Sequence, residues 1–246
     1  MRKSLTPLAI LASTILLMAS AASATPLKVE ELSQMNFFKN KGISILGSAE
    51  VNKDLTLVSV SAETPQGKQR MSAFVTNDKK NVIIGSGYND QTGEQLTIPM
   101  DMSKLKNDAG IVLGKGKKDL FVFTDPECPF CKKMDKDVLS KLSKDEYTVY
   151  VYLFPLSFHQ HAEAMSMHIL SKKTADEKMK ALHAISNDSM DFQNASYTEG
   201  ERSKIKASLA KQMEIAQSLG VSGTPTLFDS KGSPVNWMSL APKATK

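Results

Sequence analysis

The sequence predicts two domains with different folds, a small α+β module followed by an α/β domain that carries a helical insertion. Three observations support this interpretation. Alternating strand patterns occupy the region before residue 98, continuous apolar runs begin at Ile111, and a long stretch of helical pattern precedes the last of these runs. Apolar runs without alternation are typical of strands that are covered on both faces. The length of 246 residues allows two domains with a core each.

The first 24 residues have the pattern of a secretory signal peptide. Arg2 and Lys3 supply a positive start, Leu8–Met18 is mostly apolar, and Ala22-Ser23-Ala24 resembles a small-residue cleavage site. The apolar run is shorter than the about 20 residues that span a bilayer. We therefore expect cleavage near Ala24 and a soluble, exported mature chain.

Residues 25–98 are expected to form the α+β module. Leu27–Phe38 has roughly helical spacing of its apolar residues. Strand patterns follow at Leu55–Ala62, Arg70–Thr76 and Val82–Ile84, and Leu96–Ile98 is expected to close the module. Pro99 opens a linker, residues 99–110, in which Met102–Lys106 is a short helical or extended connector.

Residues 111–246 are expected to form the α/β domain. The buried strands are predicted at Ile111–Leu113, Leu120–Phe123, Tyr150–Phe154 and Thr226–Phe228. The insertion, about 157–219, contains helical patterns at Ala162–Lys172, Ala175–Ile185 and Glu201–Leu219. Its methionines, Met165, Met167, Met179 and Met213, are expected in the core. The chain after Phe228 has little helical periodicity, so a terminal helix is expected to be short or missing.

The charge balance argues against nucleic acid as a partner. The formal net charge is +5, and removing Arg2 and Lys3 from the 31 basic residues leaves 29 against 26 acidic ones. The lysines are scattered along the chain rather than clustered in one stripe. We read them as solvated surface residues.

The two cysteines, Cys128 and Cys131, are better placed for redox chemistry than for stability. Only two residues separate them, so a disulfide between them closes a very short loop and constrains the unfolded chain little. An exported protein with no other cysteine has no structural disulfide to build. The pair is therefore interpreted as a working dithiol.

Cys128 is the expected nucleophile. It follows a predicted strand and turn and precedes the helical pattern Lys132–Leu142, so its sulfur lies where unpaired N–H groups and the helix dipole favour a thiolate. Cys131, one turn inside the helix, is expected to resolve the mixed disulfide. Pro129 suits an early helical position, and Phe130 offers an apolar contact beside the reactive sulfur.

A zinc site was the competing interpretation of these cysteines. His159 and His161 could complete a set of two cysteines and two histidines. The long interval from Cys131 to His159 and the close His-x-His spacing both disfavour it. We expect no metal, and both histidines are interpreted as a solvent-facing helix start.

Thr224-Pro225 is the second part of the predicted site. A proline directly before an apolar strand cannot donate to a ladder, and the peptide bond before it is a candidate for the cis form. If this bond lies beside Cys128, the backbone of Thr224 could pair with an extended substrate. Gly-Thr-Pro alone is a common loop, so this prediction depends on the dithiol motif.

These motifs resemble one known family. Phe123-Thr124-Asp125-Pro126-Glu127-Cys128-Pro129-Phe130-Cys131-Lys132-Lys133, together with Gly223-Thr224-Pro225-Thr226-Leu227, is similar to the periplasmic disulfide isomerases of the DsbC/DsbG family. Pro129-Phe130 and the missing second cysteine pair favour the DsbG side. The resemblance covers nearly the whole mature chain.

The resemblance implies a thioredoxin fold with a helical insertion, preceded by a cystatin-like dimerisation domain. It also implies a periplasmic homodimer that reduces or isomerises disulfides of unfolded or misoxidised exported proteins and also reduces their sulfenylated cysteines. A DsbD-like membrane reductant would keep Cys128 and Cys131 reduced, without a further cofactor. Two alternatives stay open, a dithiol oxidase that introduces disulfides and a chaperone-type holdase that uses the dimer cleft.

Overall fold

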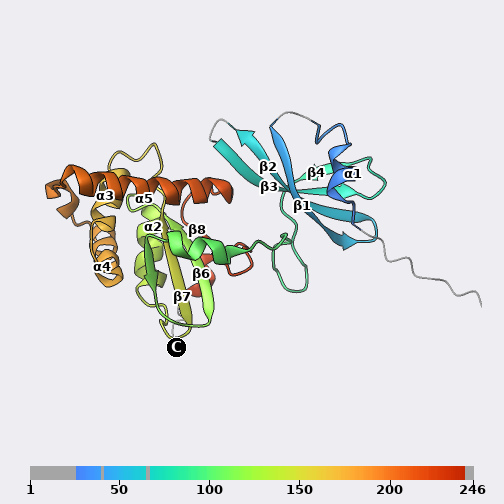
Figure 1. Ribbon diagram of the computed structural model, residues 1–246. Helices are drawn as coiled ribbons and strands as arrows, with labels where there is room; N and C mark the ends of the chain where they lie inside the picture. Colours follow the sequence, from blue (N-terminus) through green and yellow to red (C-terminus); the bar gives the residue numbers. More distant parts are fainter. Residues whose placement is uncertain (1–25, 40–41, 65–66, 242–246) are drawn as a thin grey trace, which may run out of the picture.

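The computed structural model describes residues 26–39, 42–64 and 67–241 and arranges them around two four-stranded β-sheets (Figure 1). The expected signal peptide and its cleavage site near Ala24 lie outside these residues. None of the helices within the described ranges is long and apolar enough to cross a membrane.

The first sheet is antiparallel, and its strands follow the order of the chain. They are β1 (Ile43–Asn52), β2 (Leu55–Thr64), β3 (Gly67–Thr76) and β4 (Val82–Ile84). Helix α1 (Val29–Ser33) packs on one face, where Leu32 joins a core with Val58, Val60, Ala73 and Val75. The helix and three of these strands were predicted. The helix is shorter than its predicted range, β4 has its predicted bounds, and β2 and β3 extend slightly beyond theirs.

Sequence reasoning missed β1 and wrongly placed a strand at Leu96–Ile98. The register of β1 against β2 shifts between Ile45 and Gly47 and again between Glu50 and Asn52, so its side chains do not alternate cleanly. Leu96–Ile98 forms no strand, and the backbone N–H of Leu96 makes a single bond to the carbonyl of Gly87. An isolated bridge between Tyr88 and Gln95 takes the place of a ladder.

The second sheet is mixed, with strand order β5-β7-β6-β8. Its strands are β5 (Ile111–Leu113), β6 (Lys118–Thr124), β7 (Tyr147–Leu153) and β8 (Thr226–Asp229). The β6 and β7 strands are parallel, whereas β5 pairs antiparallel with β7 and β8 pairs antiparallel with β6. All four predicted apolar runs are confirmed as strands.

Helical segments surround the second sheet. They are η1 (Met102–Asp108), α2 (Pro129–Met134), η2 (Asp135–Leu139), α3 (Ala162–Leu170), α4 (Ala175–Ser186), η3 (Asp191–Asn194), α5 (Glu199–Ser218) and η4 (Trp237–Leu240). The three long helices of the insertion are confirmed within two residues at each end. The single predicted helix after the dithiol is α2 continued by a π-helical turn, η2. Among the described residues after β8, only the short 3-10 segment η4 is helical.

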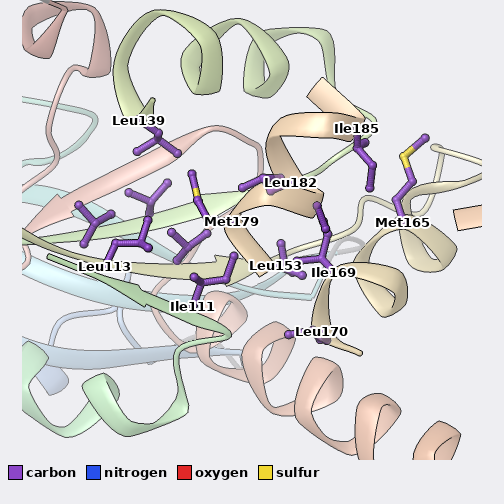
Figure 2. Packing of buried hydrophobic residues seen from close by; sticks show 14 of the residues in the cluster. Ile111, Leu113, Leu139, Leu153, Met165, Ile169, Leu170, Met179, Leu182 and Ile185 are labelled. Atoms are coloured by element: carbon purple, nitrogen blue, oxygen red, sulfur yellow. The ribbon is translucent and has the colours of Figure 1, made fainter. Parts of the chain in front are cut away.

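The second sheet is buried on both faces, as its unbroken apolar runs predicted. One face packs against α2, α3 and α4, and its core includes Ile111, Leu113, Leu153, Met165 and Met179 (Figure 2). The other face packs against η1 and α5, with Phe121, Phe123 and Tyr152 at its centre. Met165, Met167 and Met179 are buried and Met213 is partly buried, which confirms that these methionines belong to the core.

Candidate active site

Cys128 lies at the N-cap of α2, where sequence reasoning placed it. Pro129 occupies the first helical position, which suits a residue without a backbone N–H. The backbone N–H of Cys128 donates to the carbonyl of Asp125 at 3.2 Å, and the thiol contacts the carbonyl of Thr224 at 3.6 Å. The thiol thus points from the helix start toward the loop before β8.

Cys131 is one turn further along α2 and only 2% exposed. Burial raises the pKa of the Cys131 thiol to about 12, although the hydroxyl of Thr124 and the backbone N–H of Asp125 favour the thiolate. That N–H lies 3.4 Å from the Cys131 sulfur. Cys131 is therefore protonated at neutral pH, which fits a thiol that reacts second.

The register of the second sheet brings Thr224 and Pro225 to the dithiol. Thr226 of β8 pairs with Phe123 of β6, so the residues before β8 lie beside those after β6. The Thr224-Pro225 peptide bond is cis, as predicted. Its position beside Cys128 is confirmed by the contact of the Thr224 carbonyl with the thiol.

Two exposed aromatic side chains belong to segments of this site, one in α2 and one in the loop after β7. Phe130, directly after Pro129, is 67% exposed, so it offers an apolar surface to solvent. Phe158 is 74% exposed and lies in the loop between β7 and α3. Sequence reasoning named Phe130 and missed Phe158.

Asp125 and Glu127, just before Cys128, are hydrogen-bonded to the loop after β7. The Asp125 carboxylate is fully buried and accepts hydrogen bonds from the backbone N–H of Leu156 at 2.7 Å and from Nδ1 of His159 at 2.8 Å. The Glu127 carboxylate accepts from the backbone N–H of His161 at 2.6 Å. These three bonds join segments that are about thirty residues apart in the chain.

The interpretation of His159 as solvent-facing is therefore wrong. Its side chain is only 17% exposed, because it fills the space above the buried Asp125 carboxylate. His161 keeps its predicted place at the start of α3, where it is the N-cap residue and is exposed. Sequence reasoning did not single out Asp125, and its place directly after a buried strand was the available signal.

The charged residues next to the dithiol have partners of their own. Lys132 pairs with Asp188 at 2.9 Å, and Lys133 pairs with Asp137 at 2.7 Å. The Lys132 pair fastens α2 to the loop after α4. In the part of the chain that the structure describes, no three His, Cys, Asp or Glu side chains gather as a metal site requires.

The chemistry that this arrangement offers is thiol–disulfide exchange. Cys128 is at a helix start beside the Thr224 carbonyl, and Cys131 lies one turn further along the helix. The two residues are 6% and 2% exposed, so Cys131 is the more deeply buried. A thiolate at the first position can attack a disulfide, and the second thiol can then displace the product.

Comparisons with known proteins agree with this geometry. The family model of thioredoxin-like domains matches residues 105–244. The chain is 26% identical over 228 residues to the thiol:disulfide interchange protein DsbG of Pseudomonas aeruginosa, a match that covers 86% of this chain and 82% of the relative.

Solved structures of similar proteins were also found. Helicobacter pylori DsbG is 18% identical, with a TM-score of 0.39, and the match covers 82% of this chain and 98% of that one. A disulfide interchange protein from Neisseria gonorrhoeae is 22% identical, with a TM-score of 0.41, and the match covers 53% of this chain and 85% of that one.

Proposed function

Because the chain belongs to the family of thioredoxin-like domains, we propose that it is a thiol–disulfide oxidoreductase that works in the periplasm on exported proteins. It reduces or isomerises their non-native disulfides, and reduces their sulfenylated cysteines, through Cys128-Pro129-Phe130-Cys131. The observation that carries this proposal is the asymmetry of the dithiol. Both thiols are buried, but Cys128 is at a helix start and contacts the Thr224 carbonyl, whereas Cys131 lies one turn inside with a pKa raised by burial.

The roles of the site residues follow from this asymmetry. Cys128 attacks the substrate disulfide, and Cys131 resolves the mixed disulfide. Thr224 presents its backbone to an extended segment of the substrate protein, while Pro225 packs beside the dithiol. The exposed ring of Phe130 contacts apolar residues of unfolded substrates. The redox-active cysteine pair is the only cofactor that this chemistry needs.

The partners and the assembly are part of the same proposal. The segment 25–98 is a cystatin-like dimerisation domain, supported by the packing of α1 on an antiparallel sheet. Residues 99–110 link it to the catalytic domain, residues 111–246. The signal peptide is removed near Ala24, and a DsbD-like membrane reductant returns Cys128 and Cys131 to the dithiol form.

Reactivation of a scrambled, disulfide-containing ribonuclease tests the activity. The wild-type protein should restore ribonuclease activity, and Cys128→Ser should abolish the effect because no nucleophile remains. Cys131→Ser should accumulate mixed disulfides between Cys128 and the ribonuclease, visible on non-reducing gels. Equal reactivation by wild type and Cys128→Ser would contradict the proposal and favour a holdase.

The direction of the reaction is tested by the redox state of the dithiol in cells. Acid quenching followed by alkylation preserves the redox state that Cys128 and Cys131 have in the cell. A mostly reduced pair is expected, because a reductase or isomerase must hold a free thiolate. A mostly oxidised pair would instead indicate an oxidase that introduces disulfides.

A further inference from the structure

A buried carboxylate, Asp125, lies next to the dithiol and accepts three hydrogen bonds. Its Oδ1 accepts from the backbone N–H of Glu127 at 2.8 Å, and its Oδ2 accepts from the N–H of Leu156 at 2.7 Å and from Nδ1 of His159 at 2.8 Å. A carboxylate with no exposure is kept in a protein only where such bonds compensate for its lost hydration. Three donors from two segments hold this residue in one orientation.

The backbone of Asp125 connects that carboxylate to both cysteines. Its carbonyl accepts from the N–H of Cys128 at 3.2 Å, and its N–H points at the Cys131 sulfur at 3.4 Å. The N–H favours the thiolate form of Cys131, against the effect of burial. Any rotation of Asp125 therefore moves a donor away from the sulfur of Cys131.

The donor matters most in the second half of the exchange. In that step the Cys131 sulfur attacks the Cys128 sulfur of the mixed disulfide, the bond from Cys128 to the substrate breaks, and the Cys128–Cys131 bond forms. The two electrons of the broken bond leave on the substrate sulfur, which takes up the proton that Cys131 releases. Negative charge passes through the buried Cys131 sulfur, where a pre-oriented N–H lowers the barrier.

We propose that Asp125, held in place by His159, is a positioning residue that speeds the attack of Cys131 on the mixed disulfide. The inference rests on the proposed function, because it assigns a role within the same dithiol cycle. It makes a separate claim, namely that this pair affects the attack by Cys131 more than the first attack by Cys128, because Asp125 donates to the sulfur of Cys131 and bonds only the backbone N–H of Cys128.

A second aspartate–histidine pair in the fold serves as a control. It distinguishes a positioning effect on the sulfur chemistry from a general effect on stability. Nδ1 of His183 lies 2.7 Å from Oδ2 of Asp135, and Asp135 is also buried. This pair joins α4 to the π-helical turn after α2, and within the described residues neither of its side chains is hydrogen-bonded to a cysteine sulfur. Loss of either pair should destabilise the fold similarly, but only loss of the Asp125 pair should affect the sulfur chemistry.

The two half-reactions can be followed separately with one equivalent of dithiobis(nitrobenzoate) and the reduced full-length protein. Attack by Cys128 releases a first coloured thiolate, and attack by Cys131 releases the second. Cys131→Ser, which should give the first phase alone, assigns the phases. The variants are Asp125→Asn and His159→Phe, with Asp135→Asn and His183→Phe as matched controls, and thermal unfolding is measured for all four.

The second phase should slow by about tenfold or more in Asp125→Asn and His159→Phe, since small misplacements of a reacting group have effects of this size. The first phase should slow much less than the second, and both phases should be unchanged in the His183 control. An unchanged second phase, or equal slowing by His183→Phe, would overturn the inference. If Asp125→Asn does not fold, His159→Phe still decides the question. A wild-type protein that never releases the second thiolate would instead refute the proposed function.

Discussion

At the scale of single residues, Cys128 and Cys131 are both buried, and they differ in their position in α2 and in their contacts. Cys128 contacts a backbone carbonyl across the site, whereas Cys131 lies inside the helix with a pKa raised by burial to about 12. Unfolded thiols ionise near about 8.5. Unfolding of the reduced protein should therefore become easier as the pH rises from that value toward 12, because only the unfolded chain ionises Cys131 freely.

A direct check uses Cys128→Ser, in which Cys131 is the remaining thiol. At pH 8 its alkylation by iodoacetamide should be at least about a hundredfold slower than that of a free cysteine, because the thiolate is the reacting form. Mass spectrometry of samples quenched across a pH series gives the rates. If the alkylation rate reached half of its maximum at about pH 8.5, the assignment of Cys131 as the buried, resolving thiol would be contradicted.

At the scale of elements, one glutamine attaches the longest helix to the sheet. Gln212 of α5 is fully buried, and its Oε1 accepts from the backbone N–H of Leu153 at 2.8 Å, at the end of β7. Its Nε2 donates to the carbonyl of Ser208 one turn earlier. Gln212 carried no signal in the sequence, because α5 has many other polar residues and the partner of Gln212 is in another element.

Replacing Gln212 with Ala should destabilise the protein by roughly 2–4 kcal/mol, since it leaves a cavity and an unpaired backbone N–H on Leu153. Urea unfolding should show a lower midpoint with an unchanged slope. Gln217→Ala, an exposed position on the same helix, is the control and should change stability by less than about 0.5 kcal/mol. Equal effects of the two substitutions would show that the buried bond contributes nothing.

At the scale of the whole molecule, the segment between the two sheets belongs to the core of the second one. Met102 in η1 is only 1% exposed and packs with Phe121, Phe123 and Tyr152. The hydroxyl of Tyr152 donates to the carbonyl of Leu105 at 2.6 Å. A fragment that begins at Ile111 would therefore lose part of its core, whereas one that begins at Pro99 keeps it.

A fragment of residues 99–246 should be a folded monomer, and the full chain should be a dimer, because we place the dimer interface in the first sheet. Light scattering after size-exclusion chromatography measures both masses. A cooperative thermal unfolding transition shows that the fragment is folded. A dimeric fragment would move the interface to the domain that carries the dithiol.

The sequence by itself determined the strands of the second sheet, the three insertion helices and the identity of the dithiol. These features depend on local information, because unbroken apolar runs predict doubly covered strands and a cysteine pair three residues apart has few other uses. The cis Thr224-Pro225 bond was also predicted from its position before an apolar strand. Bulges in β1 removed the local pattern that made the other strands visible.

Only the tertiary structure decided what surrounds the dithiol. The bond between Asp125 and His159 joins residues 34 positions apart, and the contact of Cys128 with Thr224 joins residues 96 apart. No local pattern distinguishes a histidine that faces solvent from one that covers a buried carboxylate. That distinction depends on the pairing of β6 with β7, which places the loop after β7 near the end of β6. The register of such a pairing is a property of the assembled strands.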